Sequence, residues 1–565
     1  MNAPVRCIPP ARLHLPSLAA AALCAAAISQ AAAQPSRGWR TLDEVAFVPT
    51  VVAQSRAVTS VDVSPDGAWL YATTLVGEIL RWPIDPADGG LGDVQRFASA
   101  HFQDESGPRG LIGLAFDPTD PAMLWVTDNY PVALWGAQES RPEFSGRVSR
   151  VRIAEGPAFD GEVETYVRGL PRSCVDHLSN SLRFRANPEA DPPFLLYLSQ
   201  GSNTAIGSAD RAWCFRPERL LSAAILEIDP SLDPPEGGFD VATEPVPEDG
   251  GNRRFGFATR IGPILWAMNE RDLKSRGIVI DSGPYRGNFV HFAENGVASV
   301  RTGSQVSSPL VTTFYDPFAA DAPVRLFATG VRNAYDLVWH SNGWLYVAVN
   351  GPNGGGVTPD DPRTRINEGV QRAGGVEDYL LWLRRGDYGG HPNPLRNEYV
   401  VHGGNPTAGS DPNEISFYPV GVEPDPRYRP EQAYALGHHW SPNGLIEYRS
   451  DDTDLASERG GALGGALDGA LDGALIVANY AKGGTLRVFT LDADGGVAAD
   501  TVLVDPDGLE IAFKNPLDLT AAARGRLYVS TLDRSNGRSQ IVRLDPAQRR
   551  TLRTDSGPAA AVSAD

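Results

Sequence analysis

Short runs in which hydrophobic and polar residues alternate recur along the chain. Each run leads through a turn containing Pro, Asn or Gly into a second run that is rich in aromatic residues. Alternation with a period of two is typical of a strand with one buried face, and two such runs around a Gly-bearing turn predict a β-hairpin. The copies cover residues 61–72, 114–126, 182–198, 337–347 and 519–529, with a degenerate copy at 446–477.

A second pair of strands often follows the hairpin, as at residues 77–82 and 540–544. Four strands per repeat form the blade of a β-propeller. We therefore predict an all-β chain folded as a six-bladed β-propeller with long loop insertions. The widest gap between copies, residues 230–323, we interpret as one blade with long excursions. An array of β-sandwiches is the structural alternative, but sandwiches lack this recurrent turn and aromatic strand.

Composition agrees with a turn-rich β-protein. The 565 residues include 59 Gly and 46 Pro, and 50 Lys and Arg stand against 69 Asp and Glu, for a net charge of −19. Nucleic acids and anionic membrane surfaces attract cationic faces. The acidic balance therefore argues against both as partners, although its simplest role is solubility.

The N-terminus has the pattern of a secretory signal peptide. Arg6 and Arg12 precede an apolar stretch over residues 15–33, which ends in Ala31-Ala32-Ala33. Basic residues, an apolar segment and small residues in an A-x-A arrangement predict cleavage, here after Ala33. We expect a signal peptide (1–33), a single propeller domain (34–554) and a flexible tail (555–565). The mature chain is then periplasmic or secreted, without stable insertion in a membrane.

Cleavage leaves two cysteines, Cys174 and Cys214. Exported proteins fold in oxidising compartments, where paired cysteines form disulfides. We therefore predict a Cys174–Cys214 disulfide.

Four loop positions carry candidate chemistry, since propeller ligands gather at the mouth of the central channel. His177 can act as a general base, or serve only as a hydrogen-bonding turn residue. Arg332-Asn333 can hold an anionic or carbonyl-rich ligand, or tie two loops together. The Gly-rich loop over residues 350–356 exposes carbonyls that can bind Ca²⁺, and Lys482 can hold an anion or lie in solvent as a turn residue.

Several segments in combination resemble one family. The matching stretches are residues 109–118, His177 with Ser179 and 182–184, 330–333, 351–352, 386–389 and Lys482. Over Val58 to Asp545 the chain resembles the glucose/sorbosone dehydrogenase family, the soluble quinoprotein aldose dehydrogenases. The members compared are six-bladed propellers that bind pyrroloquinoline quinone (PQQ) and Ca²⁺ at the channel mouth.

The resemblance implies a role for each matching residue. His177 would remove the proton from the anomeric hydroxyl of a sugar while a hydride passes from its carbon to PQQ. Arg332, Asn333 and Lys482 would contact PQQ. The carbonyls of Gly351 and Pro352 would bind Ca²⁺, and the electrons would pass to an external acceptor.

Two positions depart from the family. Ser202 stands where the family has an Asp that orients the base, and Leu517 marks a segment without the Arg residues that hold the quinone carboxylates. Two alternatives therefore stay open. One is a propeller without redox chemistry that binds glycans or another partner. The other is a Ca²⁺-dependent lactonase with Asn333 and Asn350 as ligands.

Overall fold

Several parts of the chain are placed in the computed structural model. It describes residues 45–130, 142–154, 158–214, 216–243, 278–279, 289–292, 298–301, 315–319, 321–359, 372–393, 396, 398, 427–449 and 470–549. The predicted signal peptide and tail lie outside these residues. In the ranges just given, we find no helix with the length and hydrophobicity that a membrane span requires.

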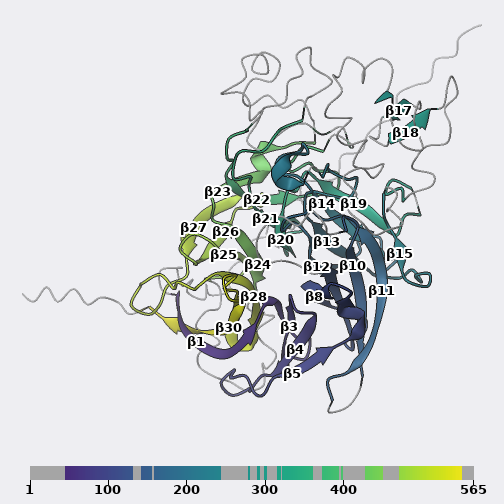
Figure 1. Cartoon of the computed structure of the whole chain (residues 1–565). Coiled ribbons are helices and arrows are strands. Elements are labelled where there is room, and N and C mark those ends of the chain that lie inside the picture. Colours follow the sequence, from purple (N-terminus) through teal and green to yellow (C-terminus); the bar gives the residue numbers. More distant parts are fainter. Residues whose placement is uncertain are drawn as a thin grey trace, which may run out of the picture.

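Six sheets stand around one centre, and the innermost strand of each sheet contacts the innermost strand of the next (Figure 1). Named from the innermost strand outward, the first blade is β2 (Val58–Val63), β3 (Trp69–Thr74), β4 (Glu78–Pro83) and β5 (Gln95–Ala98), and the second is β8 (Gly110–Phe116), β9 (Met123–Asn129), β10 (Gly146–Ile153), β11 (Gly161–Leu170) and β15 (Phe239–Asp240). The third blade is β12 (Ser179–Ala186), β13 (Phe194–Gln200), β14 (Ala224–Ile228) and β19 (Val324–Thr329), and the fourth is β20 (Ala334–Trp339), β21 (Leu345–Val349), β22 (Asp378–Leu383) and β23 (Ala433–Gly437). The fifth blade is β24 (Pro442–Tyr448), β25 (Ala474–Asn479), β26 (Leu486–Leu491) and β27 (Val497–Val502), and the last is β28 (Pro516–Ala522), β29 (Arg526–Thr531), β30 (Arg538–Gln548) and β1 (Val45–Arg56). The predicted six-bladed propeller is confirmed, and the six hairpins predicted from the sequence are the inner two strands of the six blades.

The two ends of the described chain close the ring together. Strand β1 pairs antiparallel with β30, from Val45 opposite Gln548 to Arg56 opposite Arg538. The last blade therefore takes its outer strand from the N-terminal side and its three inner strands from the C-terminal side. This pairing holds the first and last blades in one ring without a further connection.

One prediction about the blades is wrong. Residues 230–323 do not form a blade of their own, because β14 pairs directly with β19 across this interval. Of the described strands within it, β15 joins the second blade beside β11, while β16 (Ile278–Val279), β17 (Phe289–Phe292) and β18 (Ala298–Arg301) form a small separate sheet. The interval is therefore an insertion between the two outer strands of the third blade, which the hairpin pattern cannot reveal.

Hydrophobic side chains fill the space between neighbouring blades. In one such cluster, Tyr197 and Phe327 of the third blade pack against Trp339 of the fourth, with ring centroids 4.9–5.3 Å apart and steep interplanar angles. Edge-to-face aromatic contacts add to the free energy of burial. The aromatic strands seen in the sequence thus supply the contacts between sheets.

Two buried aspartates link inner strands across blade boundaries. Asp336, the third residue of β20, accepts a hydrogen bond from the backbone N–H of Leu445 in β24 at 3.1 Å. Asp518, the third residue of β28, accepts in the same way from Val61 in β2 at 2.8 Å. Burial and the charge of Asp336 raise the pKa of Asp518 to about 7. These bonds fix the register of the inner strands, whose first residues form the mouth of the channel.

Candidate functional site

A cavity of about 520 Å³ lies on the axis of the ring. All six inner strands contribute a residue from near their beginning: Thr59, Ile112, Asn180, Tyr335, Asn443 and Leu517. The rest of the wall comes from loops that precede these inner strands, from loops that follow the second strand of a blade, and from Asp378 at the start of β22. We call this space the channel-mouth cavity. A volume of this size is typical of sites for small molecules and cofactors.

His177 lies in the loop that leads into β12 and lines this cavity. The hydroxyl of Ser173 holds the loop by accepting hydrogen bonds from the backbone N–H groups of Val175 (3.1 Å) and His177 (3.0 Å). The Nδ1 atom of His177 lies 2.8 Å from the hydroxyl oxygen of Ser202. The Ser202 hydroxyl in turn donates to the carbonyl of Thr204 at 2.8 Å.

This arrangement selects one tautomer of the imidazole. A serine hydroxyl has one proton, and that proton is directed to the Thr204 carbonyl. The Ser202 oxygen therefore accepts from Nδ1–H of His177, which leaves Nε2 with a lone pair. Burial, the charge of Arg332 and the nearby His391 lower the pKa of His177 well below 6.5. At neutral pH the side chain is an uncharged base.

Arg332 follows a left-handed glycine at the end of β19. Gly330 has φ +68°, and a Cβ atom there would lie 2.2 Å from the ring of Tyr388. The Arg332 guanidinium donates from Nε to the carbonyl of Ala205 (2.7 Å) and from Nη1 to the carbonyls of Asn350 (2.9 Å) and Gly351 (3.2 Å). Burial lowers the pKa of Arg332 to about 10, so the group stays charged at neutral pH.

Arg332 is a buried cation with no ion pair among the described side chains. Two carboxylates line the same cavity, but Asp176 lies 3.4 Å from Arg534. The other, Asp378, accepts backbone N–H groups from Gly351, Trp440 and Ser441 at 2.7–2.9 Å. Carbonyl dipoles offset part of the cost of burying a charge, and an anion in the cavity would offset more.

The disulfide predicted between Cys174 and Cys214 is confirmed. It joins the His177 loop to the loop that carries Trp213. The indole of Trp213 lies edge-on to the imidazole of His177, with ring centroids 4.6 Å apart, and its ring centroid is 5.6 Å from the Arg332 guanidinium carbon. The disulfide thus holds an aromatic wall beside the base and the cation.

The structure brings together only part of the predicted site. His177, Arg332, Asn333 and Gly351 line the channel-mouth cavity. Lys482 is exposed beside it, with its ammonium nitrogen 5.8 Å from the ring centroid of Trp440, while the neighbouring Ala481 is in the wall.

Several wall residues were not predicted, and Arg534 and Trp213 are two of them that can contact a ligand. Arg534, in the loop between β29 and β30, brings a second cation to the cavity, and Trp213 lies in an insertion. Neither residue belongs to a motif in the sequence. The basic character of Arg534 next to a predicted blade turn was the only signal that could have indicated it.

The size and charge of the cavity wall bear on whether it can hold PQQ. The cavity volume accommodates a molecule of three fused rings, and two residues of its wall, Arg332 and Arg534, carry guanidinium groups that can bind carboxylates, although Arg534 also pairs with Asp176. Among the described side chains Arg332 has no ion pair, and a bound anion could supply one. The wall therefore fits an anionic quinone.

The carbonyls predicted to bind Ca²⁺ are already engaged. Gly351 O accepts from Arg332, and Pro352 O accepts from the backbone N–H of Val376 at 3.0 Å. Across the described ranges, no three or more His, Cys, Asp or Glu side chains gather as metal ligands. Calcium at Gly351 would share its ligand with a guanidinium, so these two carbonyls, as they are placed, do not fit a Ca²⁺ site.

Comparison with known proteins gives a likeness in architecture. No protein-family model and no curated protein sequence matches the chain. Among solved structures, the PQQ-bound aldose sugar dehydrogenase of Streptomyces coelicolor is 14% identical, with 90% of this chain and 100% of that chain covered and a TM-score of 0.46. The PQQ domain of pyranose dehydrogenase from Coprinopsis cinerea is 12% identical, with 91% and 99% covered and a TM-score of 0.44. At such identities and TM-scores, neither likeness assigns an activity to this chain.

Proposed function

We propose that the protein is a PQQ-dependent dehydrogenase that oxidises an aldose at the channel-mouth cavity and passes the electrons to an external acceptor. The observation that carries the proposal is the pairing of a neutral base with a buried cation at one cavity. His177 presents a lone pair at Nε2, and Arg332 presents a positive charge that forms no ion pair with a described side chain. The segments that resemble quinoprotein dehydrogenases are the ones that supply these two residues.

Each wall residue then has a task. Nε2 of His177 accepts the proton of the anomeric hydroxyl, because Ser202 holds the opposite ring nitrogen as N–H. Arg332 and Arg534 would bind the carboxylates or the quinone oxygen of PQQ, and Asn333 would help to hold the same group. Bound PQQ would supply the hydride acceptor.

Ser202 changes the energetics of the proton transfer. A carboxylate partner would stabilise the imidazolium by charge, whereas the Ser202 hydroxyl only accepts a hydrogen bond from it. The base is therefore weaker than one paired with Asp. Its lower pKa keeps it deprotonated in acidic surroundings.

The location is part of the proposal. The Cys174–Cys214 disulfide fits an oxidising compartment, and the N-terminal segment has the pattern of a signal peptide. We propose export with cleavage after Ala33. N-terminal sequencing of the exported chain checks this, with Gln34 as the expected first residue.

The activity is tested with the purified mature chain. PQQ is added with and without Ca²⁺, and the melting temperature and reduction of an artificial dye are followed with a panel of aldoses. Stabilisation by PQQ with sugar-dependent dye reduction supports the proposal. Failure of saturating PQQ to bind would refute it, and sugar binding without PQQ would then favour a glycan-binding propeller.

A further inference from the structure

One short turn holds both the base and the cation of the channel-mouth cavity. It runs from Ser202 to Ala205 in the loop that joins β13 to β14, and we call it the carbonyl turn. Its Thr204 carbonyl accepts at 2.8 Å from the hydroxyl of Ser202, which is the partner of His177. Its Ala205 carbonyl accepts from Nε of Arg332 at 2.7 Å. The conformation of this turn therefore affects both groups.

Glu218 holds the carbonyl turn in place. The side chain of Glu218 is fully buried. Its Oε1 atom accepts from the backbone N–H of Thr204 at 2.9 Å and from the Thr204 hydroxyl at 2.5 Å. Its Oε2 atom accepts from the backbone N–H of Asn203 at 3.1 Å. The carboxylate thus fixes the two peptide groups that come directly before the Thr204 carbonyl.

The carboxylate of Glu218 is ionised at neutral pH. Burial alone would raise its pKa, but the neighbouring His391 and the hydroxyls of Ser222 and Thr204 outweigh burial, and the pKa is lowered. Nε2 of His391 lies 2.9 Å from Oε1 and donates to it, because a carboxylate can only accept. Hydrogen bonds to an ionised acceptor are stronger than those between neutral groups. Glu218 therefore holds the turn more firmly than a neutral amide would.

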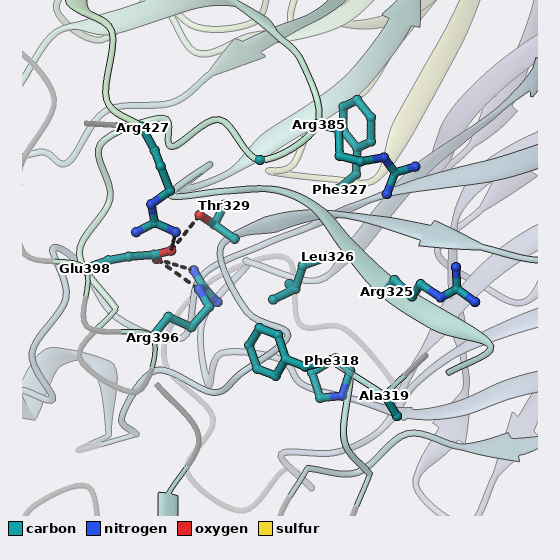
Figure 2. Close-up of a pocket in the computed structure, with 12 residues that line it drawn as sticks. Phe318, Ala319, Arg325, Leu326, Phe327, Thr329, Arg385, Arg396, Glu398 and Arg427 are labelled. Atoms are coloured by element: carbon teal, nitrogen blue, oxygen red, sulfur yellow. Dashed lines mark hydrogen bonds and ion pairs between the residues drawn. The ribbon is translucent and has the colours of Figure 1, made fainter. Parts of the chain in front are cut away.

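The chain next to Glu218 has supports of its own. Arg396 donates to the carbonyls of Leu220 at 2.8 Å and Ser222 at 2.7 Å. Figure 2 shows that Arg396 is in turn paired with Glu398, at 2.9 Å. Arg396 and Glu398 lie between β22 and β23, so they belong to the fourth blade, whereas Glu218 belongs to the third. Loss of the Glu218 carboxylate should therefore loosen the carbonyl turn and leave these contacts in place.

We propose that Glu218 is a positioning residue for the dehydrogenase reaction, and that it acts on His177 and Arg332 through the carbonyl turn. A Thr204 carbonyl held in place accepts the proton of Ser202, so His177 keeps its own proton on Nδ1. Once that carbonyl moves, the Ser202 hydroxyl can donate to Nδ1 instead, and the imidazole changes tautomer. The inference rests on the proposed function, in which His177 is the base, but the tautomer itself needs no cofactor.

The direct test is nitrogen NMR of the full mature chain without PQQ, with isotope-labelled histidine, in wild type and E218Q. The spectrum of H177Q identifies the His177 signals. In wild type, Nδ1 should have the chemical shift of a protonated nitrogen, and in E218Q it should move towards that of an unprotonated nitrogen. An unprotonated Nδ1 in wild type, or an unchanged Nδ1 in folded E218Q, would overturn the proposal.

Kinetics give a second measurement if the mature chain binds PQQ and oxidises an aldose. E218Q should lower kcat about tenfold and also weaken PQQ binding about fivefold, because the hydrogen bonds to Ser202 and to Arg332 both depend on the carbonyl turn. An unchanged kcat would overturn the role in the reaction. If wild type binds no PQQ, the proposed function fails, and the NMR comparison still decides whether Glu218 sets the tautomer.

Two further variants separate positioning from general loss of stability. E227Q is the matched control, since Glu227 is a buried carboxylate of the third blade that accepts from the Tyr197 hydroxyl at 3.0 Å, away from the carbonyl turn. It should leave the His177 signals unchanged. T204V removes the hydroxyl that donates to Glu218, and it replaces E218Q should that variant not fold. The same shift of Nδ1 is expected in T204V. A shift of equal size in E227Q, or none in T204V, would contradict the proposal.

Discussion

The Nδ1 atom of His177 lies 2.8 Å from the hydroxyl of Ser202, whose own proton is directed to the carbonyl of Thr204. The imidazole is therefore held as the Nδ1–H tautomer, with Nε2 as a base at the channel-mouth cavity. No charged group takes part in this contact.

Replacing Ser202 with Ala removes the hydrogen-bond acceptor that fixes the tautomer. We expect kcat with an aldose to fall by roughly 10- to 100-fold, as is common when a group that orients a reacting side chain is lost. The Kd for PQQ should change by less than about threefold, because Ser202 does not line the cavity. Steady-state kinetics and fluorescence titration separate the two. An unchanged kcat would show that the tautomer is not set by Ser202.

The pH dependence follows from the lowered pKa of His177. The imidazole stays neutral as the pH falls through 6.5, so we expect kcat/KM to remain level from neutral pH to below 6. In S202D the new carboxylate raises the pKa of His177, and the acidic limb should move to higher pH. If kcat/KM of the wild-type protein instead fell with an apparent pKa near 6.5, His177 would not be buried without a charged partner that stabilises the imidazolium.

The same lowered pKa has a consequence for stability. Below pH 6.5 the unfolded chain binds a proton at His177 that the folded chain does not, so this residue's contribution to the free energy of unfolding declines as the pH falls. Urea unfolding of wild type and H177Q at several pH values measures it. The difference in the free energy of unfolding between wild type and H177Q should become smaller, or change sign, as the pH is lowered.

Removal of calcium tests which cation holds the carbonyl of Gly351. Because Arg332 donates to that carbonyl, we expect PQQ binding to survive treatment with a chelator within about threefold. Isothermal titration with and without chelator gives the comparison. A loss of more than tenfold, restored by Ca²⁺, would mean that calcium displaces the guanidinium there.

Gly330 is expected to be among the least replaceable residues near the site. Its φ is +68°, and a Cβ would lie 2.2 Å from the Tyr388 ring, whereas Gly343 has φ +90° with nothing within 4 Å of a Cβ. Gly343→Ala should cost about 1–2 kcal/mol of stability from backbone strain alone. Gly330→Ala should cost more, because the ring must also move. Equal losses in chemical denaturation would show that the Tyr388 contact relaxes freely.

Much of the fold was predictable because hairpins are local. Alternation with a period of two around a turn depends only on residues that are close in sequence. Each of the six predicted hairpins corresponds to the inner two strands of a blade. The insertion between β14 and β19 was misinterpreted, because strand pairing across a long gap leaves no local pattern.

The site was predictable only in part. His177, Arg332 and Ser202 stand in recognisable segments, while Arg534 and Trp213 reach the cavity from loops distant in sequence. Lys482 is the opposite case, because it was predicted from the resemblance but is exposed and does not line the cavity. A residue can match a motif and still lie just outside the wall, since loop conformation decides where a side chain is directed.

The central claim is that one cavity holds both the cofactor and the base. The most direct measurement is the absorbance change of PQQ bound to the mature chain when an aldose is added without an electron acceptor, in wild type and H177Q. We expect rapid reduction in wild type, and in H177Q unchanged PQQ binding with reduction slowed by at least about a hundredfold. Equal rates in both proteins, or no PQQ binding by wild type, would contradict the account.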